Sequence, residues 1–365
     1  MNDEPLLLGL REPHSLQSLP LAQWDRLLRM ARRTNLLGKV AVAVEDSFGV
    51  AALPAPVQPH IVAGLRVAQH QRQAIAWECR HLRTALRSLQ VPVILLKGAA
   101  YAMADRRAAH GRLFGDVDIL VPRGALAATE AALMLAGWAT GKEDPYDQRY
   151  YRQWMHELPP MVHQQRGTIV DVHHNILPIT AASAPDVDKL IAAHEPLPDG
   201  SGLSVLAPCD MVIHSAVHLF HEGELRNGLR DLLDLEALMS ESSSHDAGFH
   251  ERLVDRAEEL ALLWPVMLAL RYCRLVLRTP LPESTVARAE RLVSWPKARL
   301  AWLDGLYLRA LAPDHPLLSS ADTTLARAML EVRGHALRMP LPRLALHLGR
   351  KAILRLFKHT SRSGA

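Results

Sequence analysis

Apolar residues recur every three or four positions along most of the first 90 residues, which is the spacing of an α-helix that buries one face. The pattern predicts a helix over Leu21–Arg33 and a long helix over His60–Leu89, separated by a Pro/Ala-rich break at Ala51–Pro59. Arginines lie between the apolar positions of the long helix, and we expect them to form a solvated face. Residues 1–90 are therefore predicted to be a helical region.

At Val91 the pattern changes from helical spacing to short apolar runs. Val91–Leu96 and Val117–Val121 are rich in Leu and β-branched residues, which is typical of buried strands. Leu158–His163 and Thr168–His173 flank the polar sequence Gln-Gln-Arg-Gly at 164–167, and this arrangement predicts two strands around a turn.

An Ala-rich helix at Gly124–Leu135, ended by Gly137, and a short strand at Leu203–Leu206 complete the predicted elements before Pro208. From Pro208 onward the spacing is helical again, and Asp210 is a plausible N-cap for the helix that follows. The patterns predict an α+β fold: a small mixed sheet with covering helices in residues 91–207, inserted between helical regions at 1–90 and 208–365.

Composition narrows the functional classes. Apolar residues make up 49% of the 365 residues and charged residues 22%, as in ordinary globular proteins. The three distant cysteines and the acidic N-terminus predict neither a disulfide framework nor a secretory signal, so we expect a cytoplasmic protein. Residues 297–365 hold 12 Lys/Arg against 4 Asp/Glu, which leaves a net charge of −4 on the remainder. The main body also lacks interleaved aromatic and basic residues, so no nucleic-acid partner is expected.

Two carboxylates on one predicted strand are the most informative chemical feature. In Asp116-Val-Asp118-Ile-Leu-Val121 the side chains alternate, so the two acids share one face while the apolar residues enter the core. Such a pair can converge on one cation or bridge two, and Mg²⁺ prefers oxygen ligands of this kind. The same pattern also fits a strand end whose acids face water.

A third acid and a Lys-Gly turn could join this pair. Asp171 lies in mid-strand between two valines, where a carboxylate is costly to bury unless a cation lies beside it. If its strand pairs beside the first one, three acids surround the same metal site. Lys97 and Gly98 follow the first predicted strand, where they could hold a phosphate or simply form a turn.

The order of these motifs resembles the DNA polymerase β superfamily of nucleotidyltransferases. Leu96-Lys97-Gly98-Ala99, the block from Arg112 through Asp116 and Asp118 to Val121, and Val170-Asp171-Val-His173 look like the uncharacterised nucleotidyltransferase family of that superfamily. The helical sequences around His214 and His218 and around Asp231 and Asp234 also resemble the region after that family's core. Gly98-Ala99 stands where the superfamily has Gly-Ser or Gly-Gly.

The resemblance implies a role for each matching residue. Asp116, Asp118 and Asp171 would be catalytic metal ligands for Mg²⁺ or Mn²⁺, with Asp171 acting either as a ligand or as the base for the acceptor. The resemblance also implies that the nucleotide is bound by Lys97, Gly98, Ala99 and Arg112. His173 and His156 lie near the predicted site in the sequence, which makes them candidates for substrate contact. Arg112 could equally be a structural partner of Asp116. The implied reaction moves a nucleoside monophosphate from an NTP to an unidentified small molecule, sugar or protein.

Two other functions stay open at this point. His214 and His218 lie one helical turn apart, and with Asp231 they could form the site of a metal-dependent phosphohydrolase, although half-buried structural histidines fit the same spacing. The chain could also be a non-catalytic nucleotide-binding or scaffold protein. Finally, a basic amphipathic helix predicted at 341–359 could contact a membrane surface or a protein, or dock on the body of the chain.

Overall fold

The N-terminal part of the fold is made of helices. The computed structural model describes residues 4–141, 148, 151–152, 154–181, 184–223, 225–313, 315 and 320–338. Its first helices are α1 (Pro5–Arg11), α2 (Leu21–Arg33), α3 (Leu37–Ser47) and α4 (Gln58–Leu86), with 3-10 turns at Pro13–Ser18 and Val50–Ala52. The two helices predicted in this region are α2 and α4, and both are confirmed.

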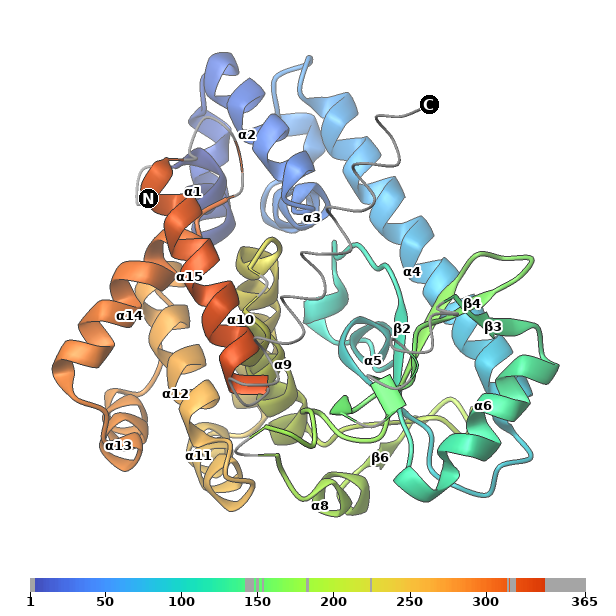
Figure 1. The fold of residues 1–365 in the computed structure, drawn as a ribbon. Coiled ribbons are helices and arrows are strands. Elements are labelled where there is room, and N and C mark those ends of the chain that lie inside the picture. The colour runs from blue at the N-terminus through green and yellow to red at the C-terminus, as the bar shows by residue number, and fades with distance from the viewer. Residues whose placement is uncertain are drawn as a thin grey trace, which may run out of the picture.

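A mixed seven-stranded sheet follows (Figure 1). Its strands are β1 (Ile94–Leu95), β2 (Val117–Leu120), β3 (Trp138–Thr140), β4 (Met161–His163), β5 (Ile169–His173), β6 (Glu195–Pro196) and β7 (Ser204–Val205). They are ordered β3-β4-β5-β2-β1-β7-β6; the β2–β5 and β1–β7 pairs are parallel and the others antiparallel. The predicted α+β class is confirmed, and β3 and β6 are the strands that the sequence patterns did not predict.

Short helices connect and cover the strands. They are α5 (Lys97–Met103), α6 (Leu126–Leu135) and α8 (Val187–Ala192), with 3-10 turns at Arg107–Ala109 and Arg123–Ala125. Helix α4 packs against α6 and α5, and α5 also contacts α9, the first helix of the C-terminal part. Figure 1 shows α4 and α6 on one flank of the sheet and the C-terminal helices on the other.

The C-terminal part is helical as predicted. Its elements are α9 (Pro208–Glu222), α10 (Gly228–His245), α11 (Phe249–Glu259), α12 (Leu263–Tyr272), a π-helical turn (Cys273–Leu277), α13 (Glu283–Val293), α14 (Lys297–Ala310) and α15 (Ala321–Arg338). Helix α9 packs against α10, α11, α12 and α15, so it lies at the centre of this part. Most of its residues, including all of Asp210–Val217, are buried because neighbouring helices contact it on several sides.

The prediction that Asp210 caps α9 is wrong. The helix begins at Pro208, and Ala207 occupies the N-cap position. Proline suits the first helical turn because its fixed φ fits the helix and it lacks an N–H that would need a partner. Asp210 lies inside the helix, where it is buried and accepts hydrogen bonds of 2.8 and 2.9 Å from the guanidinium of Arg256.

The basic helix predicted at 341–359 lies outside the described residues. Within the described part of the chain, none of the helices is both long enough and apolar enough to cross a membrane.

Candidate active site

Asp118 and Asp171 lie side by side on neighbouring strands. β2 and β5 run parallel, and their register pairs Asp118 with Asp171 and Val117 with Val170. Asp116 directly precedes β2, and the alternation of strand side chains puts it on the same face as Asp118. The structure thus brings the three carboxylates predicted from the sequence to one face of the sheet.

Asp118 is the most enclosed of the three, with 4% of its surface exposed. Its Oδ1 atom lies 3.2 Å from the ammonium nitrogen of Lys97 and 3.0 Å from Nε2 of His173. Burial by itself raises the pKa of Asp118, but the Lys97 charge and the hydrogen bond from His173 outweigh it and hold this pKa well below its usual value. Asp118 is therefore ionised at neutral pH.

Asp116 and Asp171 are more open and harder to ionise. Asp116 is exposed and Asp171 is half-buried. Desolvation and the nearby charge of Asp118 raise the pKa of both, and that of Asp171 rises to about 7. The Oδ1 atom of Asp171 is buried and has no hydrogen-bond partner among the described residues. Negative charge in this cluster is thus only partly compensated by the protein itself.

Lys97 begins α5 with an unusual backbone conformation. Its φ is +44°, in the left-handed region that non-glycine residues rarely adopt. Such strain costs about 1–3 kcal/mol and persists where the surroundings enforce it. Here the left-handed residue is the first of α5, one residue after the end of β1 at Leu95, and its ammonium group reaches Asp118.

Gly98 is required by packing against Arg112. A Cβ atom at Gly98 would lie 2.3 Å from Nη1 of Arg112 and 2.9 Å from Cδ1 of Phe114. A side chain therefore does not fit at this position, which accounts for the glycine without any approach by a phosphate. Ala99, the next residue, is buried.

Arg112 is a buried link between the sheet and helix α10. Its Nε lies 2.8 Å from Oδ2 of Asp234, and Nζ of Lys39 lies 2.9 Å from the other oxygen of the same carboxylate. The guanidinium also lies over the rings of Tyr101 and Phe114, 5.8 and 5.4 Å from their centres. Its direct acidic partner is thus Asp234 rather than Asp116, the partner that the sequence suggested.

Two histidines and a glutamate extend the site beyond the three aspartates. His173 and His156 are buried, with ring centres 5.2 Å apart. Nδ1 of His173 lies 3.5 Å from Oε2 of Glu157. Sequence reasoning missed Glu157, because an acid outside a regular strand pattern carries no local signal; its position next to His156 was the only available hint.

Comparison with protein families identifies a family for this chain. The family described as "Uncharacterised nucleotidyltransferase" matches residues 20–278, more than two thirds of the chain. The chain belongs to this family. The resemblance inferred from the motifs is therefore confirmed, and the family supports a general role in nucleotidyl transfer. No curated protein matches the chain.

The residues around the three aspartates fit a divalent cation. Three carboxylates offer oxygen ligands, one of their oxygens is buried without a partner, and two of the three have raised pKa values. A cation among them would favour ionisation of all three. Hard cations such as Mg²⁺ and Mn²⁺ match an all-oxygen set.

The histidine helix considered for a phosphohydrolase adjoins the same site. His214, on α9, is buried, and burial together with the charge of Lys97 lowers its pKa well below the usual value. Nδ1 of His218 lies 2.9 Å from Oε1 of Glu222. The electrostatic effect of His218 is among those that lower the pKa of Asp118. Helix α9 thus lies beside the aspartates.

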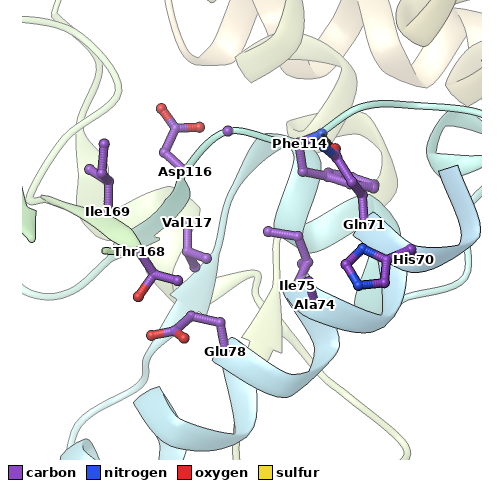
Figure 2. Close-up of a pocket in the computed structure, with 11 residues that line it drawn as sticks. His70, Gln71, Ala74, Ile75, Glu78, Phe114, Asp116, Val117, Thr168 and Ile169 are labelled. Carbon is purple, nitrogen blue, oxygen red and sulfur yellow. Dashed lines mark hydrogen bonds between the residues drawn. The ribbon is translucent and has the colours of Figure 1, made fainter. Parts of the chain in front are cut away.

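A cavity of about 240 Å³ opens on the other side of β2, between this strand and α4. Figure 2 shows Ile75 and Ala74 of α4 facing Val117 across it, with Glu78 and Thr168 at one end. Asp116 stands at the rim, and its carboxylate points away from the cavity. The cavity therefore borders the site without being the place where the three carboxylates converge.

Proposed function

We propose that this chain transfers a nucleoside monophosphate from an NTP to an acceptor hydroxyl, with Asp116, Asp118 and Asp171 as the catalytic, metal-binding residues. The observation that carries the proposal is the parallel β2–β5 register, which places Asp118 directly beside Asp171. Membership of a nucleotidyltransferase family supports the reaction class. The proposed acceptor belongs to a small molecule, a sugar or a protein.

In this reaction the acceptor oxygen bonds to the α-phosphorus, the bond from that phosphorus to the α,β-bridging oxygen breaks, and pyrophosphate leaves. A bound Mg²⁺ or Mn²⁺ would supply positive charge to the phosphoryl oxygens. The protein itself contributes the Lys97 ammonium, fixed at 3.2 Å from Asp118. The acceptor proton needs a base, and the unpartnered Oδ1 of Asp171 can either accept it or bind the cation.

The two histidines support this chemistry by holding other groups in place. His173 donates to Asp118 and so keeps that carboxylate ionised and oriented. His156 is buried, and burial lowers its pKa well below the usual value, so it is neutral at pH 7. We propose that both position the site and that substrate contacts come mainly from Lys97, Asp116 and Asp171, whose side chains solvent reaches.

The test measures NTP-dependent release of pyrophosphate with Mg²⁺ or Mn²⁺, using each NTP with sugars, hydroxylated metabolites and Ser- or Tyr-containing peptides as acceptors. Asp118→Asn should lower the rate roughly 10³-fold, because it removes one charge of the cluster that binds the cation. The matched control is Asp188→Asn, an exposed acid on α8. An unchanged rate in Asp118→Asn would overturn the proposal.

The same assay separates the rival functions. A phosphohydrolase that uses the α9 histidines would release phosphate, lose activity in His214→Ala and His218→Ala, and keep it in Asp118→Asn. A non-catalytic nucleotide sensor would bind an NTP, seen as a rise in melting temperature, yet release no pyrophosphate with any acceptor.

A further inference from the structure

A second cluster of ligand atoms lies beside the aspartates, on residues that come from two neighbouring segments. An isolated bridge joins Glu157 to His173, and the amide of Leu158 donates to the carbonyl of Val172 at 2.8 Å. The amide of His174 likewise donates to the carbonyl of His156 at 2.8 Å. These bonds hold residues 156–158 against the end of β5, so that one ligand atom from each of His156, Glu157 and His173 lies within 4.8 Å of the others.

The hydrogen bonds of His173 fix which of its nitrogens is available. Because Nε2 lies 3.0 Å from the ionised carboxylate of Asp118, Nε2 carries a hydrogen and donates it. In the neutral ring, Nδ1 then presents a lone pair, and it faces the Glu157 carboxylate at 3.5 Å. A lone pair and a carboxylate facing each other repel unless a cation or a proton lies between them.

His156 contributes one ring nitrogen to the same cluster. Its side chain is 6% exposed, and Nδ1 has no hydrogen-bond partner among the described residues. A buried ring nitrogen without a partner is destabilising, because it has lost its hydrogen bonds to water. The three groups therefore offer two imidazole nitrogens and one carboxylate oxygen without enough donors of their own.

This donor set differs in kind from the three aspartates. Two imidazoles with one carboxylate suit Zn²⁺, Fe²⁺, Co²⁺ or Mn²⁺, whereas an all-oxygen set suits Mg²⁺. A metal-binding histidine usually donates its other N–H to a carboxylate, and the His173–Asp118 bond has that form. Three protein ligands leave a coordination position open, and the Glu157 side chain is 18% exposed, so solvent reaches the cluster.

We propose that His156, Glu157 and His173 form a transition-metal site, with Zn²⁺ the preferred ion, that is separate from the magnesium site at the aspartates and linked to it through the His173–Asp118 hydrogen bond. The proposal rests on the geometry of these three residues and does not require nucleotidyl transfer. The competing arrangement is a protonated His173 that donates to both Asp118 and Glu157 with no metal bound.

The test is metal binding by the full chain in excess Mg²⁺, which occupies the aspartates. Protein stripped with a chelator is titrated with Zn²⁺ and with Co²⁺, and bound metal is measured by elemental analysis and by the visible absorbance of Co²⁺. We expect one Zn²⁺ per chain. His156→Ala and Glu157→Gln should each abolish stoichiometric binding, and Asp118→Asn should weaken it about 10- to 100-fold.

The controls separate this site from its neighbours. His245→Ala removes an exposed histidine at the end of α10 and should keep one Zn²⁺. Asp116→Asn should keep the metal while losing nucleotidyl transfer, so failure of either proposal leaves the other standing. Glu157→Gln preserves the side-chain shape and covers the case in which His156→Ala fails to fold. Absence of Zn²⁺ and Co²⁺ from the wild type, or equal binding by Glu157→Gln, would overturn the proposal in favour of the protonated histidine.

Discussion

Asp234 is the residue on which a single substitution should act most strongly away from the reaction centre. It is 2% exposed, and its two oxygens lie 2.8 and 2.9 Å from the cationic groups of Arg112 and Lys39. The side chains of both cations are no more than 10% exposed. Asp234→Asn keeps the shape of the side chain but leaves two buried positive charges opposite a neutral amide.

The expected loss is about 3–5 kcal/mol of unfolding free energy, the usual cost of breaking a buried ion pair by removing one partner. Total stabilities are about 5–15 kcal/mol, so this is a large fraction. With a urea slope of about 3 kcal/mol per molar, the midpoint should fall by roughly 1–2 M. Urea titrations followed by far-ultraviolet circular dichroism and tryptophan fluorescence measure the shift.

Acidic pH provides a second readout of the same interaction. Burial raises the pKa of Asp234, but Lys39 and Arg112 outweigh burial and the net shift is downward. A depressed carboxyl pKa stabilises the folded state above the unfolded value of about 4, and this contribution is lost as the pH falls further. The stability difference between wild type and Asp234→Asn should therefore shrink below about pH 4.

An exposed ion pair is the matched control. Asp105 pairs with Arg72 at the surface, and their side chains are 74% and 39% exposed. Asp105→Asn should cost less than about 1 kcal/mol, because water screens such pairs. A loss below about 1 kcal/mol in Asp234→Asn, or equal losses in the two variants, would refute the reasoning.

Three further variants test other parts of the structure. Burial and nearby Arg333 and Arg338 lower the pKa of His221 to about 3, so its folded form stays neutral while the unfolded chain gains a proton below about pH 6.5. Between about pH 7.5 and 5.5, the unfolding free energy of the wild type should thus fall by about 1.4 kcal/mol more than that of His221→Phe. If the two proteins lose the same unfolding free energy over this range, His221 does not cause the pH dependence. Gly98→Ala should lower the unfolding free energy by about 1–3 kcal/mol, because the added methyl group crowds Arg112. The same urea titrations measure this change, and an unchanged unfolding free energy would show that Arg112 moves aside freely. Ala74→Leu partly fills the cavity beside α4. Its rate of pyrophosphate release should stay within about twofold of the wild-type rate, because the cavity lies on the other face of β2. A tenfold fall in this rate would show that the substrate enters the cavity.

The elements that the sequence predicted are those with strong local patterns. Leu21–Arg33 matches α2 at both ends, and the hairpin around 164–167 matches β4 and β5. β3 and β6 are no shorter than β4 and β7, which were predicted, but most of their residues are exposed or half-buried, so no apolar run marks them. The common face of Asp116 and Asp118 follows from the strand period, whereas the pairing with Asp171 needed the order of strands in the sheet.

Contacts between distant segments could not be predicted in this way. Arg112 and Asp234 are 122 residues apart, and no local pattern selects one acid of α10 over the acid before β2. Glu157 reaches His173 through an isolated bridge outside any named strand. The Asp210 prediction was wrong for a related reason: a capping residue and a partner for Arg256 look alike until α11 is placed.

The link from Arg112 to Asp234 bears on how the protein can be dissected. A fragment ending near residue 207 would retain every proposed catalytic aspartate, yet it would remove the carboxylate that pairs with the Arg112 guanidinium. Because that guanidinium packs against Gly98, the resulting disturbance would reach the turn that carries Lys97. Shortened versions made for crystallography or for activity assays should therefore extend through α10, even though the proposed catalytic aspartates all lie at the sheet.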